Sequence, residues 1–357
     1  MRQGKRLAVS LLPRVLVPGI LAVMVCLPVL AQERPSTSAL ACVRCHAAQA
    51  TNQPQTPMAR AIELPGANPT LKEHPKMNFR RDAYSYTVET AGDKSTYTVT
   101  DGTHTVSVPI RLSFGTGGQT WLLERDGKFY DSLVSYYPSI SGLDVTMGEE
   151  KVVPHTVDEA MGRELGEGEA KACFGCHATH AVTEGKLTLG SMQTGVTCEH
   201  CHVGSAAHLL DAIQGEFGSA PPKLGRMKSE DISRFCGQCH RTWETVVRGH
   251  FSGEVNVRFQ PYRLANSKCF DGADPRISCV ACHDPHQDVV RQDSTYDSKC
   301  LACHGAATAG TTTAKACPVA KVNCVSCHMP KVNLPGGHMA FTDHEIRVVR
   351  AGEGYPD

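Results

Sequence analysis

The sequence predicts a mainly α-helical fold with irregular loops, interrupted by a small antiparallel β insert near the N-terminal side. Three observations lead to this prediction. A motif, Cys-x-x-Cys-His, recurs seven times in 357 residues. Six copies lie in residues 151–357, where proline and glycine are frequent and little chain remains for a conventional core. Residues 76–150 carry no copy and alternate between apolar and polar side chains, as strands do.

The N-terminal segment, residues 1–31, is typical of an export signal. Basic residues open the chain, and an apolar stretch with small residues near its end follows. This pattern predicts a secretory signal peptide that is removed, together with Cys26. An uncleaved anchor is the alternative, although the apolar run over residues 15–31 is at the short limit for a spanning helix. Export predicts a periplasmic or extracellular location.

Each copy of the motif has the residues that attach a haem covalently. Two thiols reach two vinyl groups of the porphyrin, and the adjacent histidine ligates the iron. A zinc half-site or a thiol redox pair is the alternative for a single copy, but neither would recur seven times with histidine after the second cysteine. We therefore predict seven covalent haems c, whose porphyrins would form much of the core.

The predicted haem-attaching residues follow directly from the motif. The thioether cysteines are Cys42, Cys45, Cys173, Cys176, Cys198, Cys201, Cys236, Cys239, Cys279, Cys282, Cys300, Cys303, Cys324 and Cys327. The proximal histidines are His46, His177, His202, His240, His283, His304 and His328.

Ten histidines lie outside the motifs, enough to give every iron a second axial ligand. His180 and His286 follow a proximal histidine by three positions, so on a helix they would share its face and would reach a neighbouring haem. Methionine ligation would raise the potential of a haem. The distal candidates are His155, His180, His208, His250, His286, His338 and His344, with Met58 as a rival for the first haem. The weaker candidates are His74, His104 and His200.

Two cysteines remain outside the motifs and the signal, Cys269 and Cys317. An even remainder in an oxidising compartment predicts one disulfide between them. The alternatives are a thiolate that ligates an iron, or a thiol that stays free.

The chain accordingly divides into four parts. They are the signal peptide (1–31), a first haem-binding segment (32–75), the β-rich insert without haem (76–150) and a six-haem cytochrome domain (151–357). Within the insert we expect strands at 84–89, 97–100, 106–114, 121–124 and 128–137, with a hairpin turn at Asp126-Gly127.

Three local signatures resemble bacterial multihaem c-type cytochromes, the relatives of the tetrahaem electron carrier of nitrifying bacteria. They are Cys198-Glu-His-Cys-His-Val-Gly-Ser-Ala-Ala-His208, Cys279-Val-Ala-Cys-His-Asp-Pro-His286, and Cys324-Val-Ser-Cys-His-Met-Pro-Lys331 followed by His338 and His344. The resemblance implies that His208 and His286 are distal ligands of neighbouring haems. The family form has glycine-proline where this chain has Val203-Gly204, which leaves the turn there in doubt.

The expected function is electron transfer through the haems, in respiratory or extracellular electron transfer. Formal net charge is zero with no long run of one sign, which argues against a nucleic-acid partner. The expected partners are redox proteins, either a membrane quinol-linked donor or other cytochromes. The alternative is a multihaem oxidoreductase that acts on a small nitrogen or sulfur compound at one open iron, although no catalytic residue stands out. A third hypothesis is a subunit of a larger redox complex.

Overall fold

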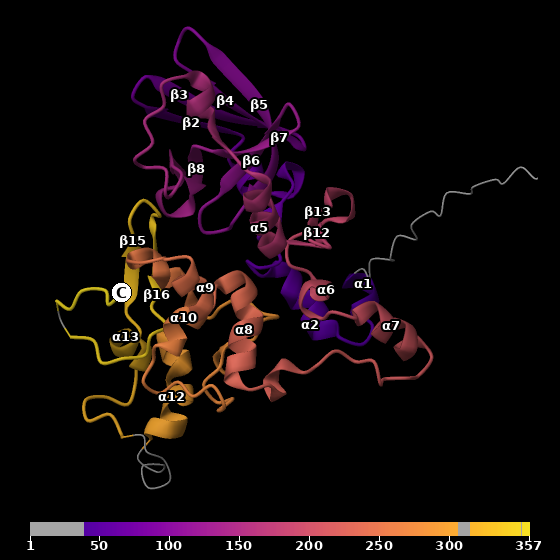
Figure 1. Cartoon of the computed structure of the whole chain (residues 1–357), viewed down its shortest axis with the longest axis vertical. Coiled ribbons are helices and arrows are strands. Elements are labelled where there is room, and N and C mark those ends of the chain that lie inside the picture. Colours follow the sequence, from indigo (N-terminus) through magenta and orange to yellow (C-terminus); the bar gives the residue numbers. More distant parts are fainter. Residues whose placement is uncertain (1–38, 306–314, 351) are drawn as a thin grey trace, which may run out of the picture. The chain divides into compact units, whose positions relative to one another are not determined.

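The computed structural model describes residues 39–305, 315–350 and 352–357 (Figure 1). The predicted signal peptide, including Cys26, lies outside the described residues. Among the helices of the described ranges, none has the length and apolar character needed to cross a membrane.

The predicted fold class was wrong, because the protein is not mainly helical. Helices make up 35% and strands 24% of the described structure. Seven strands form a large antiparallel half-barrel in the order β10-β7-β6-β5-β4-β3-β2, and β1 adds to it by pairing with β5. The haem motifs lie on short helices, from four residues in α6 to twelve in α8, whereas β5 alone has ten. The prediction from the number of motifs was therefore too high in helix, because each motif needs only a short helix.

The predicted strands of the insert are confirmed, with one exception. The run at 128–137 is broken at Leu133, where the Ser132 hydroxyl accepts from Trp121 N at 3.0 Å and donates to Val134 O at 2.9 Å. The strands are β1 (Ile62–Glu63), β2 (Lys76–Arg81), β3 (Tyr84–Ala91), β4 (Lys94–Thr100), β5 (Thr105–Phe114), β6 (Thr120–Arg125), β7 (Lys128–Ser132), β8 (Val134–Tyr137), β9 (Gly142–Val145) and β10 (Gly162–Glu164).

The hairpin between β6 and β7 shows why its turn could be predicted. Arg125 pairs with Lys128, which leaves a two-residue loop of Asp126 and Gly127. Both loop residues have positive φ, 52° and 74°, as a type I′ turn requires. Aspartate and glycine tolerate that conformation, so the register of the strands follows from the turn.

The sheet buries two apolar clusters, and one of them reaches a haem motif. The first cluster includes Tyr86 of β3, Tyr97 of β4 and Trp121 of β6. In the second, Phe174 is fully buried with its ring centroid 5.7 Å from that of Phe114 and 5.9 Å from that of Phe129. Because Phe174 lies on α5 (Glu167–His177), this contact packs the second motif against the sheet.

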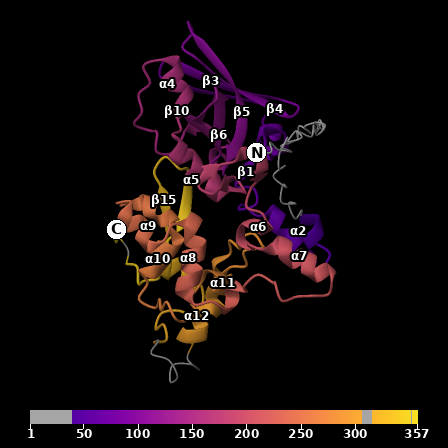
Figure 2. The same cartoon turned by 45° about the vertical axis from the view of Figure 1, so that its right-hand side comes forward.

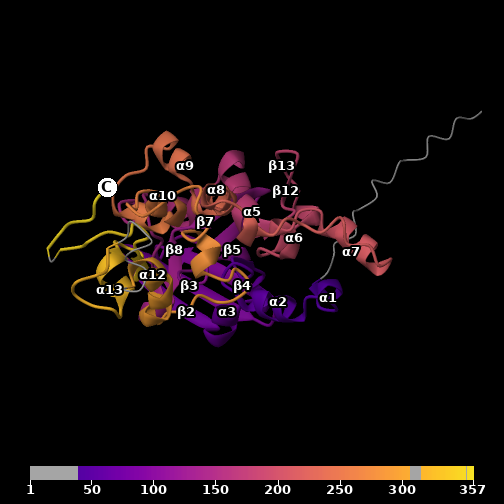
Figure 3. The same ribbon diagram turned by 90° about the horizontal axis from the view of Figure 1, so that it is seen from below.

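The remaining helices are short and carry or connect the motifs. They are α1 (Ala39–Cys42), α2 (Ala47–Asn52), α3 (Pro69–Glu73), α4 (Val157–Met161), α6 (Cys198–Cys201), α7 (Ser205–Ile213), α8 (Ser229–His240), α9 (Trp243–Arg248), α10 (Gln260–Ala265), α11 (Cys279–Cys282), α12 (Asp297–His304) and α13 (Cys324–His328). Helix α8 packs against α10 and α11 (Figure 2). Helices α1 and α2 lie next to each other (Figure 3).

Small hairpins and single 3₁₀ turns complete the fold. The hairpins are β11 (Ala178–Thr179) with β14 (Gln193–Thr194), β12 (Val182–Thr183) with β13 (Lys186–Leu187), and β15 (Lys331–Leu334) with β16 (Met339–Thr342). The 3₁₀ turns are η1 (Gln53–Gln55), η2 (Pro65–Ala67), η3 (Pro138–Ile140), η4 (Leu189–Ser191), η5 (Leu224–Arg226), η6 (Glu254–Arg258) and η7 (Asp293–Tyr296).

Candidate functional site

Six of the seven Cys-x-x-Cys-His motifs share one local geometry, whereas in the first motif α1 ends at Cys42 and a turn leads to Cys45 and His46. In α5, α8, α12 and α13 the helix ends at the motif histidine. In α6 and α11 the helix spans the two cysteines, and the histidine follows at once. One helical turn places the two thiols on the same face, because residues three apart are neighbours on a helix. Each motif therefore presents two thiols and an adjacent imidazole.

Thiols of different motifs lie side by side. The motif cysteines are half-buried or exposed. A hydrogen bond with Cys279, together with burial, raises the pKa of the Cys236 thiol. Burial, together with the neighbouring Cys198, raises the pKa of Cys42. Thiol pairs between motifs are Cys42 with Cys198, Cys176 with Cys239, Cys236 with Cys279, and Cys300 with Cys324.

Three motif histidines each face a second imidazole from a distant part of the chain. The ring centroids are 6.4 Å apart for His46 and His208, 6.1 Å for His202 and His286, and 6.3 Å for His283 and His344. Two imidazoles that ligate one metal from opposite sides hold their nitrogens about 2 Å from it, so their centroids lie about 6 Å apart. The three pairs have this spacing.

Hydrogen bonds through Nδ1 orient several motif histidines and two of the histidines that face them. The bonds to backbone oxygens are His177 to Ala61 O at 3.0 Å, His304 to Lys315 O at 2.8 Å, His328 to Arg347 O at 2.8 Å and His344 to Thr342 O at 2.9 Å. His286 instead uses Nδ1 toward Asp284 Oδ1 at 3.0 Å. A metal-ligating histidine is oriented in this way, with Nε2 left for the metal.

Burial keeps three of the facing imidazoles neutral. It lowers the pKa of His202 and of His283, and it lowers the pKa of His344 to about 4. Desolvation disfavours the charged imidazolium, so these rings keep a free lone pair at neutral pH. A neutral imidazole is the form that binds a metal.

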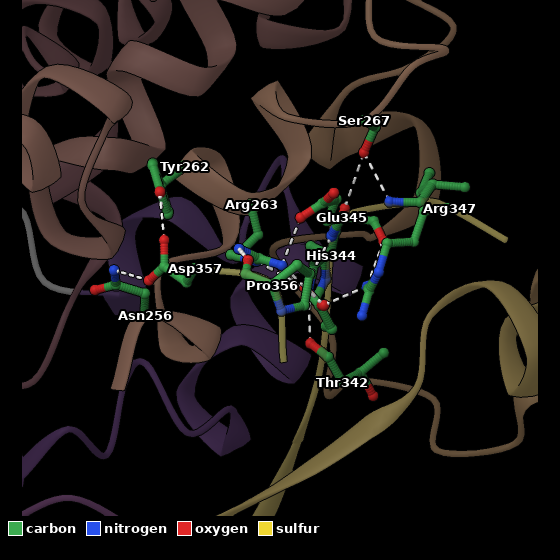
Figure 4. Close-up of polar contacts among 12 residues, drawn as sticks. Asn256, Tyr262, Arg263, Ser267, Thr342, His344, Glu345, Arg347, Pro356 and Asp357 are labelled. Atoms are coloured by element: carbon green, nitrogen blue, oxygen red, sulfur yellow. Dashed lines mark hydrogen bonds and ion pairs between the residues drawn. The ribbon is translucent and has the colours of Figure 1, made fainter. Parts of the chain in front are cut away.

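A buried ion-pair cluster on α10 holds the segment that carries His344 (Figure 4). Arg263 donates to Asp343 through Nε at 2.9 Å and through Nη2 at 3.0 Å, and both residues are 0% exposed. Glu345 lies 2.5 Å from Arg263 Nη2, and Arg347 Nη1 lies 2.6 Å from Asp343. This cluster anchors the residues on both sides of His344.

The same segment supports the seventh motif as well as the fifth. Arg347 N donates to His328 O at 3.2 Å, and the His328 ring bonds back to the Arg347 carbonyl. His344, three residues earlier, faces His283. No sequence motif pointed to Arg263, because it is an ordinary charged residue until the fold joins it to Asp343 across 80 positions.

Two predicted distal candidates lie against carboxylates. His338 Nε2 is 2.7 Å from Asp144 Oδ2, and its ring centroid is 4.8 Å from that of Tyr137. His180 is exposed, with Nε2 3.7 Å from Glu199 Oε2 on α6. Within the described residues, neither makes a ring contact with a motif histidine.

The other candidates lie apart from the three pairs. His155 and His250 are exposed. Met58 is half-buried, and its carbonyl accepts from Val196 N at 3.0 Å. The imidazole that faces the first motif histidine is His208, and not a methionine. Of the weaker candidates, His74 bonds through Nε2 to the Tyr136 hydroxyl at 2.9 Å.

The predicted disulfide between Cys269 and Cys317 is not formed in the structure. Both residues are free thiols. Burial raises the pKa of Cys269, and the nearby thiols that add to this effect are Cys300 and Cys303 of the sixth motif. The folded loop therefore places Cys269 beside a haem-attaching pair.

Comparison with known proteins supports the class that this geometry indicates. Residues 147–203 match the protein family described as cytochrome c554 and c-prime, and the matched stretch holds the whole of the second and third motifs. The match supports a c-type cytochrome, a haem protein of electron transfer. No curated protein and no solved structure gives a significant match.

The residues present fit haem c, the cofactor that this family implies. The paired thiols, the spacing of the three imidazole pairs and the Nδ1 hydrogen bonds are what an attached, axially ligated haem requires. No group of three or more histidine, cysteine or acidic side chains in the described ranges is arranged around a bare metal ion.

Proposed function

We propose that the protein is an exported multihaem cytochrome that transfers electrons through haems c attached at all seven motifs. The observation that carries this proposal is the spacing of the three imidazole pairs, 6.1 to 6.4 Å between centroids. A pair of imidazoles on one iron gives a closed, low-spin centre, which is suited to electron transfer. When bound, each haem supplies reversible one-electron chemistry.

The protein's own residues would link alternate motifs into a series. His208 follows the third motif and faces the first, His286 follows the fifth and faces the third, and His344 follows the seventh and faces the fifth. The segments after the third, fifth and seventh motifs thus each complete the site two motifs earlier. A bound haem would tie two distant segments together, so attachment and folding would be coupled.

Contacts between thiols support a continuous path for electrons. The adjacent thiols join motif one to three, two to four, four to five and six to seven. The third motif approaches the fourth, where Cys201 adds to the raised pKa of Cys236 and of Cys239. The fifth motif approaches the sixth, where Cys300 contributes to the raised pKa of Cys282. Haems attached at adjacent thiols would lie close at their vinyl edges, and electrons could pass between them without large motions of the chain.

The proposed location and partners follow from the export signal and the neutral balance of charge. We place the protein in the periplasm or outside the cell, with a membrane quinol-linked donor or another cytochrome as its partner. A subunit of a larger redox complex is compatible with the same chemistry.

An oxidoreductase with one open iron is the second candidate function. Among the ring contacts of the described ranges, four motif histidines have no second imidazole facing them. They are His177, His240, His304 and His328. An open iron at one of them could bind a small nitrogen or sulfur compound.

Two measurements on the purified, full-length protein would test these proposals. Intact mass together with the absorption of the reduced haems counts the attached haems, and fewer than seven would overturn the count. Electron paramagnetic resonance of the oxidised protein then separates the functions. Only low-spin signals are expected for a carrier. A high-spin signal of one iron per molecule that shifts with nitrite or hydroxylamine would support the oxidoreductase instead.

A further inference from the structure

Two arginines lie next to the fourth motif and share one aromatic ring. Arg241 follows the motif histidine His240 directly, and Arg258 ends η6. The guanidinium carbon of Arg241 is 5.3 Å from the centroid of Phe259 and 4.9 Å from that of Phe251. The guanidinium carbon of Arg258 is 5.8 Å from the centroid of Phe259. Two positive charges are therefore gathered on the same ring.

The backbone is strained where it delivers the first of these charges. Arg241 has φ 60° and ψ 122°, in the region that residues with a Cβ rarely adopt. A residue held in such a conformation persists only where the surrounding structure requires it. Here the strained turn ends α8 and directs the chain from His240 toward Phe251 and Phe259.

The positive charges lack a counter-charge among the described residues. Neither arginine forms an ion pair there, although Glu150 and Glu254 line the same cavity of about 350 Å³ as Arg258. Arg258 Nε is buried and has no hydrogen-bond partner. Burial lowers the pKa of Arg258, and the charge of Arg241 adds to that effect. A buried donor with a like charge beside it is costly unless an anion pairs with it.

The cofactor of the fourth motif would supply a suitable anion. A haem carries two propionate carboxylates on its edge, and the guanidinium fork matches a carboxylate with two parallel hydrogen bonds. We propose that Arg241 and Arg258 bind a propionate of the haem attached at Cys236 and Cys239. This inference rests on the proposed function, since it requires that haem to be present. The other source of the same chemistry is a small oxyanion, such as nitrite.

The pair would tune that haem as well as hold it. Two cations beside a haem favour its reduced state, which carries one positive charge fewer, and so raise its midpoint potential. They would also keep the propionate ionised, because an opposite charge nearby favours the charged form of a carboxyl group. The fourth haem should therefore have a potential that depends little on pH near neutrality.

The test compares Arg258→Gln and Arg241→Gln with Arg248→Gln in the haem-loaded protein. Arg248 is exposed on α9 and loses the same charge, so it is the matched control. Potentials are measured by optical titration at several pH values, after intact mass has counted the haems. We expect one haem in each test variant to shift to lower potential and to become pH-dependent, and Arg248→Gln to match the wild type. Arg258→Lys should restore part of the shift, because a lysine keeps the charge without the fork.

The possible failures are distinguishable. Unchanged potentials in both test variants, with all haems attached, would overturn the inference and leave the proposed function standing. Nitrite that shifts a haem of the wild type but not of Arg258→Gln would show that a small anion takes the site, and would also overturn it. A wild-type protein without haem at the fourth motif would refute the proposed function itself. The glutamine variants could fail to fold. In that case Arg258→Lys is decisive: if its potential equals that of the wild type, the propionate does not receive two parallel hydrogen bonds from Arg258.

Discussion

The replacement Arg263→Met should be among the most damaging single changes outside the haem motifs. It removes the partner of Asp343, a carboxylate that is 0% exposed and accepts two hydrogen bonds from Arg263. Removing one partner of a buried ion pair costs about 3–5 kcal/mol, because the other charge stays buried. Arg347 still lies 2.6 Å from Asp343 and compensates in part. We therefore expect the free energy of unfolding to fall by about 3 kcal/mol, near the lower end of that range.

The assay is denaturant unfolding of the haem-loaded protein at pH 7, followed by haem absorption. Tyr262→Phe is the matched control, since its hydroxyl donates to Asp357 Oδ1 at 2.7 Å in an exposed hydrogen bond and does not touch Asp343. That change should cost at most about 1 kcal/mol. The double variant Arg263→Met/Asp343→Leu should be less destabilised than Arg263→Met alone, because no unpaired carboxylate remains.

A spectroscopic readout separates anchoring of His344 from general stability. If the cluster holds His344 against His283, Arg263→Met should add one high-spin ferric signal and Tyr262→Phe should add none. An Arg263→Met protein that unfolds within 1 kcal/mol of the wild type, with every haem low-spin, would refute this account of the cluster.

Three further outcomes are expected. Burial would raise the pKa of Asp343, but the hydrogen bonds and charge of Arg263 outweigh it and hold that pKa below its usual value. The stabilisation is therefore complete above about pH 4 and fades as the pH falls further. When unfolding is measured at decreasing pH, the free energy of unfolding should fall less in Arg263→Met than in the wild type. His208→Ala should create one high-spin haem, whereas His155→Ala, at an exposed histidine, should leave the paramagnetic spectrum unchanged. Gly195→Ala should destabilise by more than about 1 kcal/mol, since its Cβ would collide with the backbone oxygen of Ala59. Gly185→Ala, at a similar φ but in open space, should cost about 1 kcal/mol by thermal unfolding.

The short-range features of this protein could be predicted because their chemistry is local. The seven haem-attaching motifs need only five consecutive residues each, and the turn at Asp126 and Gly127 needs only two. The strands of the sheet were visible for a similar reason, since alternation along a single strand records which side chains face the core.

The extent of the sheet was decided by the tertiary structure. Strands β1 and β10 have two and three residues, too few to show a pattern, and they join the sheet only by pairing with β5 and β7. The fold class depends on these strand pairings and on the short helices. The number of haem motifs predicts neither.

The pairing of histidines also lay beyond the sequence. The sequence ranked the ten histidines outside the motifs, but it did not say that His208 would face the first motif or that Asp144 would engage His338. The anchor between Arg263 and Asp343 spans 80 positions and has no local signature. Covalent attachment depends on neighbours along the chain, whereas axial ligation and charge pairing depend on neighbours in space, and only the folded chain determines those.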